Sequence, residues 1–357
     1  MSLKKRLGLG VVLIVAIGLA YLLFAPVPIN PGAWTPPDAP TLTGQYQQNT
    51  RLAPVEKLSL GDGNKPEDVA LDAEGRIYAG FEDGRLMVLE PDGTQPRVFA
   101  NTHGRPLGLI FDREGNLIVA DALKGLLSVN KAGEVKVLAE EADGTKFGCL
   151  NDLDIGADGT IYFTEASNKF PMSQFTNDLL EHQPNGRLLA LDPHSREPRT
   201  LLRGIYFANG VAVSPDQTFV LVNETGEYRV RRVWLNGPKM GQNDIFIDNL
   251  PGFPDGISSN GRDRFWLALV TPRQALFDRM LPYPTMRKMV ARLPRFMQPA
   301  PKRYSFVLAL DSQGRVIENL QNGSPDCFSE IANVVEYNGA LYFGSIGEDT
   351  VGRFSLK

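Results

Sequence analysis

A repeated unit occupies the chain from about residue 60 onward and limits the folds open to it. Each copy has a short apolar strand, a turn rich in Asp, Asn or Gly, and a second strand rich in aromatic and β-branched residues. The six copies begin at Pro66, Arg105, Leu150, Ala208, Phe253 and Glu330. Four-stranded repeats of about 40 residues are typical of β-propeller blades, which bury their faces against neighbouring blades. We therefore predict an all-β fold, a six-bladed β-propeller over residues 51–357.

The sixth copy needs an outer strand from elsewhere in the chain. It ends with a third strand at residues 351–356. The apolar segment 52–60, which lies before the first blade, can pair as the missing strand and close the ring without an open edge. The alternative is a frayed sixth blade, which would expose an unpaired strand.

Four oxygen-bearing side chains share one position of the repeat. When the copies are aligned on their second strands, the residues ten positions upstream are Glu67, Leu107, Asn151, Asn209, Asp255 and Ile331. Because the first strand of each blade lines the central channel, these positions should form a ring around the axis. Two carboxylates and two amides offer the hard oxygen donors that Ca²⁺ prefers. We predict Glu67, Asn151, Asn209 and Asp255 as metal ligands.

A simpler explanation exists for part of this ring, because Asn and Asp favour turns before strands and both Asn209 and Asp255 precede glycine. Glu67 argues against a turn-only role, since glutamate has no special turn preference and its buried charge would need a partner. Asp68 and Asp152 follow one position later in the register. They are candidates for supporting the metal ligands from the second shell, with a strand-capping or solvated role as the alternative.

The N-terminus has the pattern of a membrane anchor. A basic tail at residues 1–6 precedes an apolar run at 7–25, whose nineteen residues at about 1.5 Å each match a hydrocarbon core of about 30 Å. The positive-inside rule places the tail in the cytoplasm and the propeller on the extracytoplasmic, periplasmic or extracellular, side. A cleaved signal peptide is the alternative. The Pro-rich residues 26–50 are expected to act as a stiff spacer that holds the domain off the membrane.

Two long insertions interrupt the repeat, at residues 167–185 in the third blade and 271–303 in the fifth. The second contains eight Lys or Arg residues and one acidic residue, Asp278, interleaved with apolar side chains. A basic amphipathic helix of this kind can lie on an anionic membrane or cap an apolar substrate site. We predict a helical lid at 271–303 that also contacts membrane lipid. The alternative is a helix packed on the propeller with a solvated basic face.

Composition narrows the function classes further. A net charge of −4 gives no reason to expect a nucleic-acid partner. The two cysteines, Cys149 and Cys327, are too few for a disulfide scaffold, and the sequence leaves their redox state open. The chain has no G-x-S-x-G elbow, and its three histidines have no evident Ser or Cys partner in the sequence.

Several motifs give the chain a family resemblance that covers almost its whole length: PEDVALD from Pro66, GTIYFTEAS from Gly159, FANGVAVSPD from Phe207 and LPGFPDGIS from Leu250. Together they resemble the strictosidine-synthase-like family, which includes the adipocyte plasma membrane-associated proteins. More distantly the chain is similar to senescence-marker gluconolactonases and to paraoxonases. The resemblance implies a calcium ion in the tunnel, held at the four ring positions predicted above.

The ring and the resemblance together predict a calcium-dependent hydrolase of lactones or aryl esters, with a metal-polarised carbonyl. Asp255 is expected to act both as a ligand and as the catalytic base or nucleophile. One alternative is a non-catalytic, membrane-anchored binding propeller with a structural calcium. Another is a strictosidine-synthase-type condensing enzyme, but Ala332 stands where that enzyme has its glutamate, and Glu330 is only a weak substitute.

Overall fold

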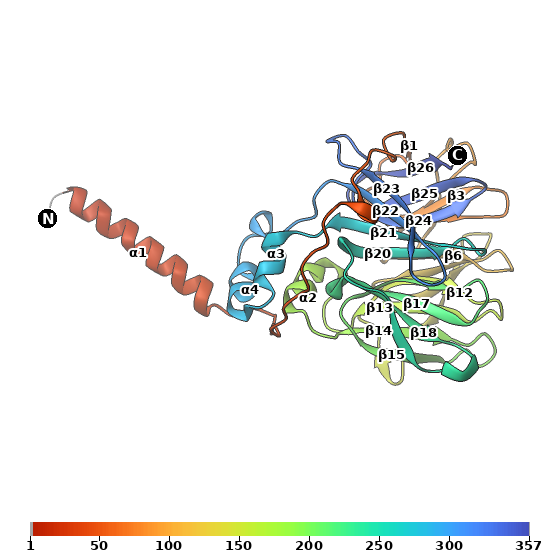
Figure 1. Ribbon diagram of the computed structural model, residues 1–357, viewed down its shortest axis with the longest axis horizontal. Coiled ribbons are helices and arrows are strands. Elements are labelled where there is room, and N and C mark those ends of the chain that lie inside the picture. The colour runs from red at the N-terminus through yellow and green to blue at the C-terminus, as the bar shows by residue number, and fades with distance from the viewer. Residues whose placement is uncertain (1–2, 357) are drawn as a thin grey trace.

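The computed structural model describes residues 3–356 and contains six four-stranded antiparallel sheets that follow one another along the chain (Figure 1). The prediction of a six-bladed β-propeller is confirmed. The first blade has β2 (Val69–Leu71), β3 (Ile77–Gly80), β4 (Arg85–Leu89) and β5 (Arg97–Asn101). The second has β6 (Pro106–Phe111), β7 (Leu117–Asp121), β8 (Gly125–Val129) and β9 (Val135–Ala139). The third, after the hairpin β10 (Glu141–Ala142) and β11 (Thr145–Lys146), has β12 (Cys149–Ile155), β13 (Ile161–Ser167), β14 (Gly186–Leu191) and β15 (Pro198–Ile205).

The other three blades keep the same order of strands. The fourth has β16 (Ala208–Val213), β17 (Phe219–Glu224), β18 (Arg229–Trp234) and β19 (Asn243–Ile247). The fifth has β20 (Gly252–Ser259), β21 (Phe265–Pro272), β22 (Ser305–Leu310) and β23 (Val316–Asn322). The sixth has β24 (Ile331–Tyr337), β25 (Ala340–Ser345) and β26 (Thr350–Ser355). Five of the six second strands begin at the residue on which the repeats were aligned, and β25 begins one residue earlier.

A strand from the N-terminal side completes the sixth blade. β1 (Glu56–Ser59) pairs antiparallel with β26, with Leu58 opposite Val351, as segment 52–60 was predicted to do. Strand β1 contributes Leu58 to the buried core between the sixth and first blades. This closure removes the exposed edge that an incomplete blade would leave.

Apolar side chains fill the space between every pair of neighbouring blades. Six separate clusters of buried residues lie at the six blade junctions. At the junction of the fourth and fifth blades, for example, the rings of Phe219 and Phe265 lie 6.0 Å apart. Burying one such side chain stabilises the fold by roughly 2 kcal/mol, so each blade depends on its neighbours.

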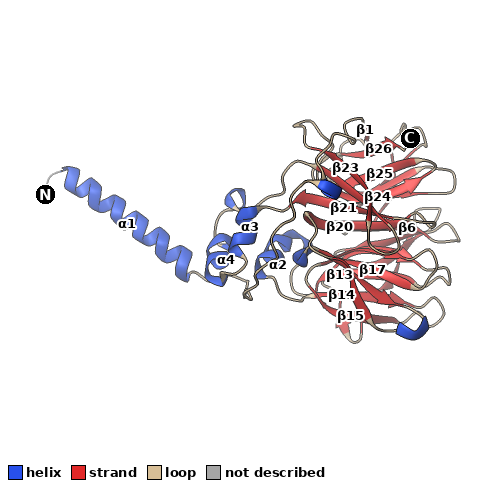
Figure 2. Cartoon of the chain, viewed as in Figure 1, coloured by secondary structure: helices blue, strands red, loops and turns tan. Residues whose placement is uncertain are grey.

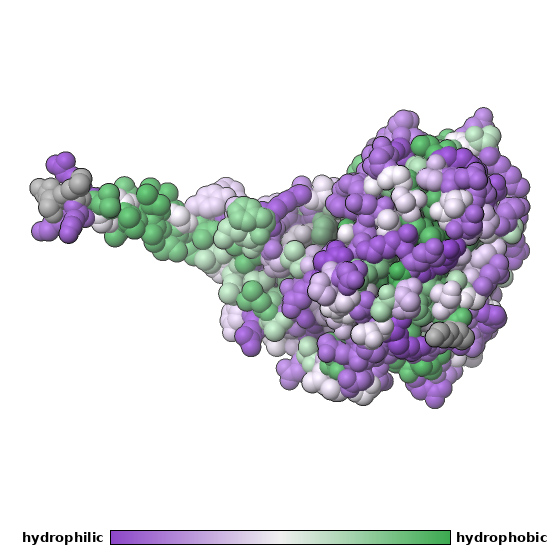
Figure 3. Space-filling model, turned by 90° about the horizontal axis from the view of Figure 1, so that it is seen from above, coloured by the Kyte–Doolittle hydropathy of each residue, from purple (hydrophilic) through white to green (hydrophobic). Residues whose placement is uncertain are grey.

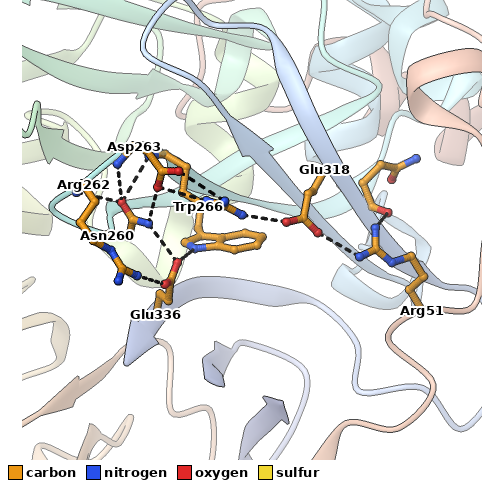
Figure 4. A network of polar contacts seen from close by, with 9 residues as sticks. Arg51, Asn260, Arg262, Asp263, Trp266, Glu318 and Glu336 are labelled. Carbon is orange, nitrogen blue, oxygen red and sulfur yellow. Dashed lines mark hydrogen bonds and ion pairs between the residues drawn. The ribbon is translucent and has the colours of Figure 1, made fainter. Parts of the chain in front are cut away.

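A polar network joins the last two blades and the N-terminal segment (Figure 4). Glu318 on β23 accepts hydrogen bonds from Arg264 at 2.7 Å and from Arg51 at 2.9 Å. Glu336 on β24 accepts a hydrogen bond from the indole N–H of Trp266 on β21 at 2.7 Å. These contacts fasten the segment before β1 close to the blade that it completes.

The four α-helices gather at one end of the propeller (Figure 2). They are α1 (Leu3–Phe24), α2 (Phe175–Glu181), α3 (Ala275–Met280) and α4 (Pro284–Ala291). The connections also contain the single 3₁₀ turns η1 (Gly44–Tyr46), η2 (Met172–Gln174), η3 (Thr225–Glu227), η4 (Gly237–Lys239) and η5 (Arg295–Met297). α1 projects away from the domain, and it is long and apolar enough to cross a membrane.

Residues 26–50 lie against the domain instead of holding it away. The Trp34 amide donates to the Leu281 carbonyl, and its indole stacks on His182 at 4.3 Å. Ile29 is buried in an apolar cluster with Leu180. The prolines keep the segment extended. It nevertheless packs on the domain, because removing its apolar side chains from water lowers the free energy.

The lid differs from a single amphipathic helix with a solvated basic face. It consists of α3, α4 and η5, and Arg287 on α4 is fully buried. The Arg287 guanidinium donates to the carbonyls of Leu180, Glu181 and Gly32, which belong to the other insertion and the N-terminal segment. One of the predicted surface cations therefore serves to hold three separate segments together.

Candidate metal centre

Irregular strand pairing places the predicted ring residues at the axis. In β12, β16 and β20 the regular pairing with the second strand is interrupted between Leu150 and Leu153, between Ala208 and Val211, and between Pro254 and Ile257. Asn151, Asn209 and Asp255 lie within these bulges. A bulge bends its strand and re-aims the side chains at that point. Three blades thus share the same local distortion, and at Asn151, Asn209 and Asp255 the side chains do not have to follow the regular alternation between the two faces of the strand.

Glycines allow the inner strands to approach each other at the next position. A Cβ atom on Gly210 would lie 2.5 Å from the Asp255 carbonyl oxygen of the following blade. A Cβ on Gly108 would lie 2.7 Å from the Asp152 Cα, and one on Gly256 would meet the Ala332 carbonyl oxygen at 2.6 Å. The turn-like glycines noted in the sequence therefore serve close packing around the axis.

Three members of the ring interact with one another. Glu67 and Asp255 are 5% and 7% exposed. Burial raises the pKa of Asp255 well above its usual value, the negative charge of Glu67 raises it further, and a hydrogen bond from the Asn209 side chain lowers it. Burial also raises the pKa of Glu67. Two carboxylates that disfavour each other's charge in a buried site are electrostatically suited to a cation between them.

The fourth member, Asn151, is 4% exposed, and its side-chain nitrogen has no hydrogen-bond partner among residues 3–356. Turning the amide over would place its oxygen at the unpartnered position, because the two atoms of the amide occupy equivalent places. An oxygen donor there matches the chemistry of a calcium ligand. The donor set thus fits a hard divalent cation. The assignment of these four residues as ligands stays a prediction.

A cation that the ring prediction missed lies at the same level. Arg105 is 7% exposed, and its guanidinium donates to the Glu67 carboxylate at 3.0 Å and to the Lys65 carbonyl at 3.2 Å. It comes from the second blade, two residues before Leu107 and immediately before β6. The pairing of β6 with β7 is irregular between Pro106 and Gly108, so strand alternation could not have identified Arg105 from the sequence. Arg105 neutralises part of the charge that a bound metal would otherwise balance.

Asp68 and Asp152 connect neighbouring inner strands. The Asp68 carboxylate accepts hydrogen bonds from the backbone amides of Val69 at 2.6 Å and of Leu109 in the next blade at 2.7 Å. The Asp152 carboxylate accepts one from Val211 in the following blade at 3.0 Å. These bonds agree with the strand-capping alternative. A supporting role toward a metal stays a prediction for both residues.

The tunnel continues below the ring as a cavity of about 160 Å³, whose mainly apolar wall also carries several polar side chains. It is lined by Asp68, Asp152, Asp154 and Asn333, among others. Burial raises the pKa of Asp68 to about 7 and that of Asp154 to about 6. Asn333 donates to the Asp68 carboxylate and so connects the sixth blade to the first. Sequence reasoning missed Asn333, because it lies two positions beyond the apolar ring residue Ile331.

The described part of the chain, residues 3–356, contains no cluster of three or more His, Cys, Asp or Glu side chains placed to hold a metal. The ring has only two such side chains, and its other two oxygen donors are amides. Cys149 and Cys327 are both buried and free. Burial raises the pKa of the Cys149 thiol, which argues against a thiolate ligand or nucleophile at this position.

The ring lies at the end of the propeller that carries the insertions. β20 begins with Gly252 opposite Pro272, where the chain leaves for the lid. Leu107, the apolar ring member, packs in a cluster with Phe207 and with Met172 and Phe175 of the other insertion. The tunnel is therefore covered on this side by apolar side chains.

The structure does not supply a glutamate at the synthase position. Ala332 is buried beside the ring of inner strands. The Glu330 carboxylate lies against Gly347, and its pKa is raised by burial and lowered by the charge of Arg303. The charged groups that act on Glu330 thus come from the fifth, sixth and first blades, and none of the ring residues is among them.

The fold and the tunnel define the class of the protein: a six-bladed β-propeller with a polar axial site. Among solved structures it resembles a gluconolactonase of Xanthomonas campestris, with a TM-score of 0.62, 18% identity, and coverage of 92% of this chain and 98% of the other. It also resembles regucalcin of Agrobacterium tumefaciens, described as a calcium-binding protein, with a TM-score of 0.60, 15% identity, and coverage of 85% and 94%. These similarities concern the fold.

Sequence relatives narrow the class to a family. The strictosidine synthase pattern matches residues 151–238, and the N-terminal pattern of strictosidine synthase-like proteins matches residues 44–89. Strictosidine synthase-like protein 6 of Arabidopsis thaliana is 36% identical over 312 residues, 85% of this chain and 82% of its own. The adipocyte plasma membrane-associated protein of Rattus norvegicus is 33% identical over 373 residues, 97% and 99% of the two chains. The chain belongs to the strictosidine synthase-like family.

The membrane-associated relative and the exposed apolar helix α1 together support a single-pass membrane protein. The predicted anchor at residues 7–25 falls almost entirely within α1, which ends at Phe24.

Proposed function

We propose that the protein is a calcium-dependent hydrolase of lactones or aryl esters, with Glu67, Asn151, Asn209 and Asp255 holding the metal. One observation carries the proposal. Glu67 and Asp255 are both buried carboxylates, the negative charge of Glu67 acts on Asp255, and the buried amides Asn151 and Asn209 share their position in the repeat. A gluconolactonase and a calcium-binding protein among the fold neighbours add support.

When bound at the ring, the calcium ion would polarise the carbonyl of the substrate. Asp255 would take the proton of the attacking water as a general base, because a cation at the ring would hold its carboxylate in the charged, proton-accepting form. The Asn209 side chain favours the charged form of the Asp255 carboxylate, because it lowers the pKa of that group. Arg105 fixes the Glu67 carboxylate, to which it donates at 3.0 Å. The apolar residues above the ring, Leu107 and Phe175, would exclude bulk water from the reacting carbonyl.

We place the propeller on the extracytoplasmic side of the membrane, because Lys4, Lys5 and Arg6, in the first turns of α1, precede its apolar run at residues 7–25. Fusions of a reporter active only in the cytoplasm to the N-terminus and to the C-terminus test this orientation. Activity of the N-terminal fusion alone supports it, and activity of the C-terminal fusion rules it out.

The function is tested by assaying the purified full chain against aryl esters and lactones, with calcium and with chelator. Turnover should require calcium and should fall by roughly 10²–10⁴-fold in the Asp255→Asn variant. Asp154→Asn is the matched control, because Asp154 is a part-buried carboxylate that lines the cavity below the ring. Turnover unchanged by chelator or by Asp255→Asn would exclude the mechanism. Calcium binding without turnover on any substrate would favour the non-catalytic binding propeller.

A further inference from the structure

The end of α1 is fastened to the lid by hydrogen bonds. The Arg292 guanidinium, at the end of α4, donates to the Ala25 carbonyl at 2.6 Å and to the Leu22 carbonyl at 2.7 Å. The Tyr21 hydroxyl donates to the Arg292 carbonyl at 3.4 Å. A cation at the C-terminus of a helix satisfies free carbonyls and complements the helix dipole. The membrane helix therefore leaves the domain directly at the lid.

The residues that follow α1 hold the domain close to this point. The Gly32 carbonyl accepts a hydrogen bond from buried Arg287, and the Asn30 amide donates to Glu181 at 3.1 Å. In Figure 1 the lid helices α3 and α4 lie between α1 and the propeller. If α1 spans a bilayer, the lid must lie at the level of the membrane surface.

Large apolar side chains are exposed on the lid, and we name them the docking face. They are Leu276 at 67%, Tyr283 at 62%, Met286 at 43%, Phe296 at 87% and Met297 at 56% exposed. In the space-filling view, apolar surface continues from α1 onto the region where the helix meets the domain, whereas the propeller surface is mainly hydrophilic (Figure 3). Single exposed apolar residues are ordinary, but a group of them beside a membrane helix indicates an interaction surface.

Basic side chains accompany the docking face. Arg279, Lys288 and Lys302 form no ion pair within residues 3–356, and the exposed Arg295 donates only to the Ser173 carbonyl in this part of the chain. Each free cation near an anionic membrane strengthens binding by about fivefold. Apolar side chains combined with unpaired cations match the interfacial zone of an anionic bilayer.

We propose that the docking face lies in the interfacial zone of the bilayer that holds α1, so that the lid end of the tunnel faces the membrane. The substrate is then an apolar lactone or ester that enters from the lipid; this second statement rests on the proposed function. Burial of the ring under apolar insertion residues agrees with such an entry, because an apolar substrate can pass where water is excluded.

The first experiment measures the depth of the lid in the membrane, with the full chain in nanodiscs of phosphatidylcholine and phosphatidylglycerol. An environment-sensitive fluorophore is attached to Leu276→Cys or Phe296→Cys, and a lipid-borne quencher is added. Ile317→Cys is the control, because Ile317 is 46% exposed in the same blade on β23, at the strand end away from the lid. The native Cys149 and Cys327 are buried and should not be labelled.

We expect the labels at residues 276 and 296 to be quenched roughly threefold more strongly than the label at 317, because the interfacial zone is reached by acyl chains. Equal quenching at all three positions would overturn the docking proposal. A protein partner on this face would leave the labels unquenched in nanodiscs that contain only this chain, and so also counts against it.

The second experiment tests entry from the lipid, using Leu276→Glu and Phe296→Glu in nanodiscs. The kcat/KM for a long-chain ester dissolved in the bilayer should fall by roughly fivefold, while that for a short, water-soluble aryl ester stays within about twofold. An equal change for both substrates would overturn entry from the membrane. If the wild-type chain hydrolyses neither ester, the proposed function fails, and the quenching experiment still decides the docking face.

Discussion

The substitution Asp255→Asn should change the stability of the protein in opposite directions with and without calcium. Asp255 is 7% exposed and Glu67 is 5% exposed. Burial raises the pKa of both carboxylates, and the negative charge of Glu67 raises that of Asp255 further. An amide of the same shape removes one buried charge. Without a metal we therefore expect the free energy of unfolding to rise by roughly 1–3 kcal/mol.

With calcium the expected order is reversed. A ligand present at about 1,000 times its Kd stabilises the native state by about 4.1 kcal/mol, which exceeds the gain expected from the amide. For a domain of this size that stabilisation raises Tm by roughly 6 °C. The Asp255→Asn variant loses one of only two charged ligands, so most of this increase should disappear. Wild type should be the more stable protein in calcium and the less stable protein in chelator.

Thermal unfolding of the purified full chain, followed by intrinsic fluorescence in calcium and in chelator, measures both effects. Asp154→Asn is the control, because the Asp154 carboxylate accepts backbone hydrogen bonds from Val213 at 2.7 Å and Ile155 at 2.7 Å. Loss of this carboxylate should lower Tm equally in calcium and in chelator, and it should leave the increase in Tm that calcium causes unchanged. A wild-type calcium response in Asp255→Asn would refute the assignment of the ring.

Three other predictions follow from named contacts. Arg105→Gln should tighten calcium binding by roughly tenfold in isothermal titration, because about 1.4 kcal/mol of competition for Glu67 is removed; weaker binding would mean that the guanidinium supports the site. Gly210→Ala should lower the free energy of unfolding by roughly 2–4 kcal/mol, because its Cβ would lie 2.4 Å from a backbone nitrogen. Gly226→Ala is the control and should lower the free energy of unfolding by less, because its Cβ would have its nearest neighbour at 3.1 Å. Equal losses in the two variants would contradict the steric explanation. Burial raises the pKa of Asp178 to about 6 from 3.8, so the native state binds the proton more tightly and stability should fall as pH rises from about 4 to about 6. Asp178→Asn should remove roughly 2–3 kcal/mol of that fall in denaturant titrations, and an unchanged pH profile would refute it.

The blades and the closure of the ring could be predicted because they depend on local pattern. Strand β3, for example, is a continuous apolar run bounded by turns, and only a neighbouring blade can bury both faces of such a strand. The level of Glu67, Asn151, Asn209 and Asp255 followed from the same period, since equivalent positions of a repeat are brought to equivalent heights.

Electrostatic partners at the site could not be predicted in this way. Arg105 belongs to the second blade, whose own ring residue is the apolar Leu107. Its hydrogen bond to Glu67 of the first blade depends on the path that the arginine side chain takes in the folded protein. Similarly, Asp68 resembles a possible metal support in the sequence, but its hydrogen bonds to Leu109 and Asn333 link three blades. Such contacts join residues far apart in the chain, and the repeat gives their height but not their partners.

The sequence by itself determined the number of blades, the strand that completes the ring, the apolar N-terminal helix and the four oxygen-bearing positions, because each is encoded by periodicity or by a local run of one residue type. Only the tertiary structure decided that residues 26–50 pack on the domain and that Arg287 is buried while Arg292 caps α1. The physical reason is that an arginine satisfies whichever carbonyls the folded chain brings to it. Charge in the sequence does not tell whether a cation faces water, lipid or backbone.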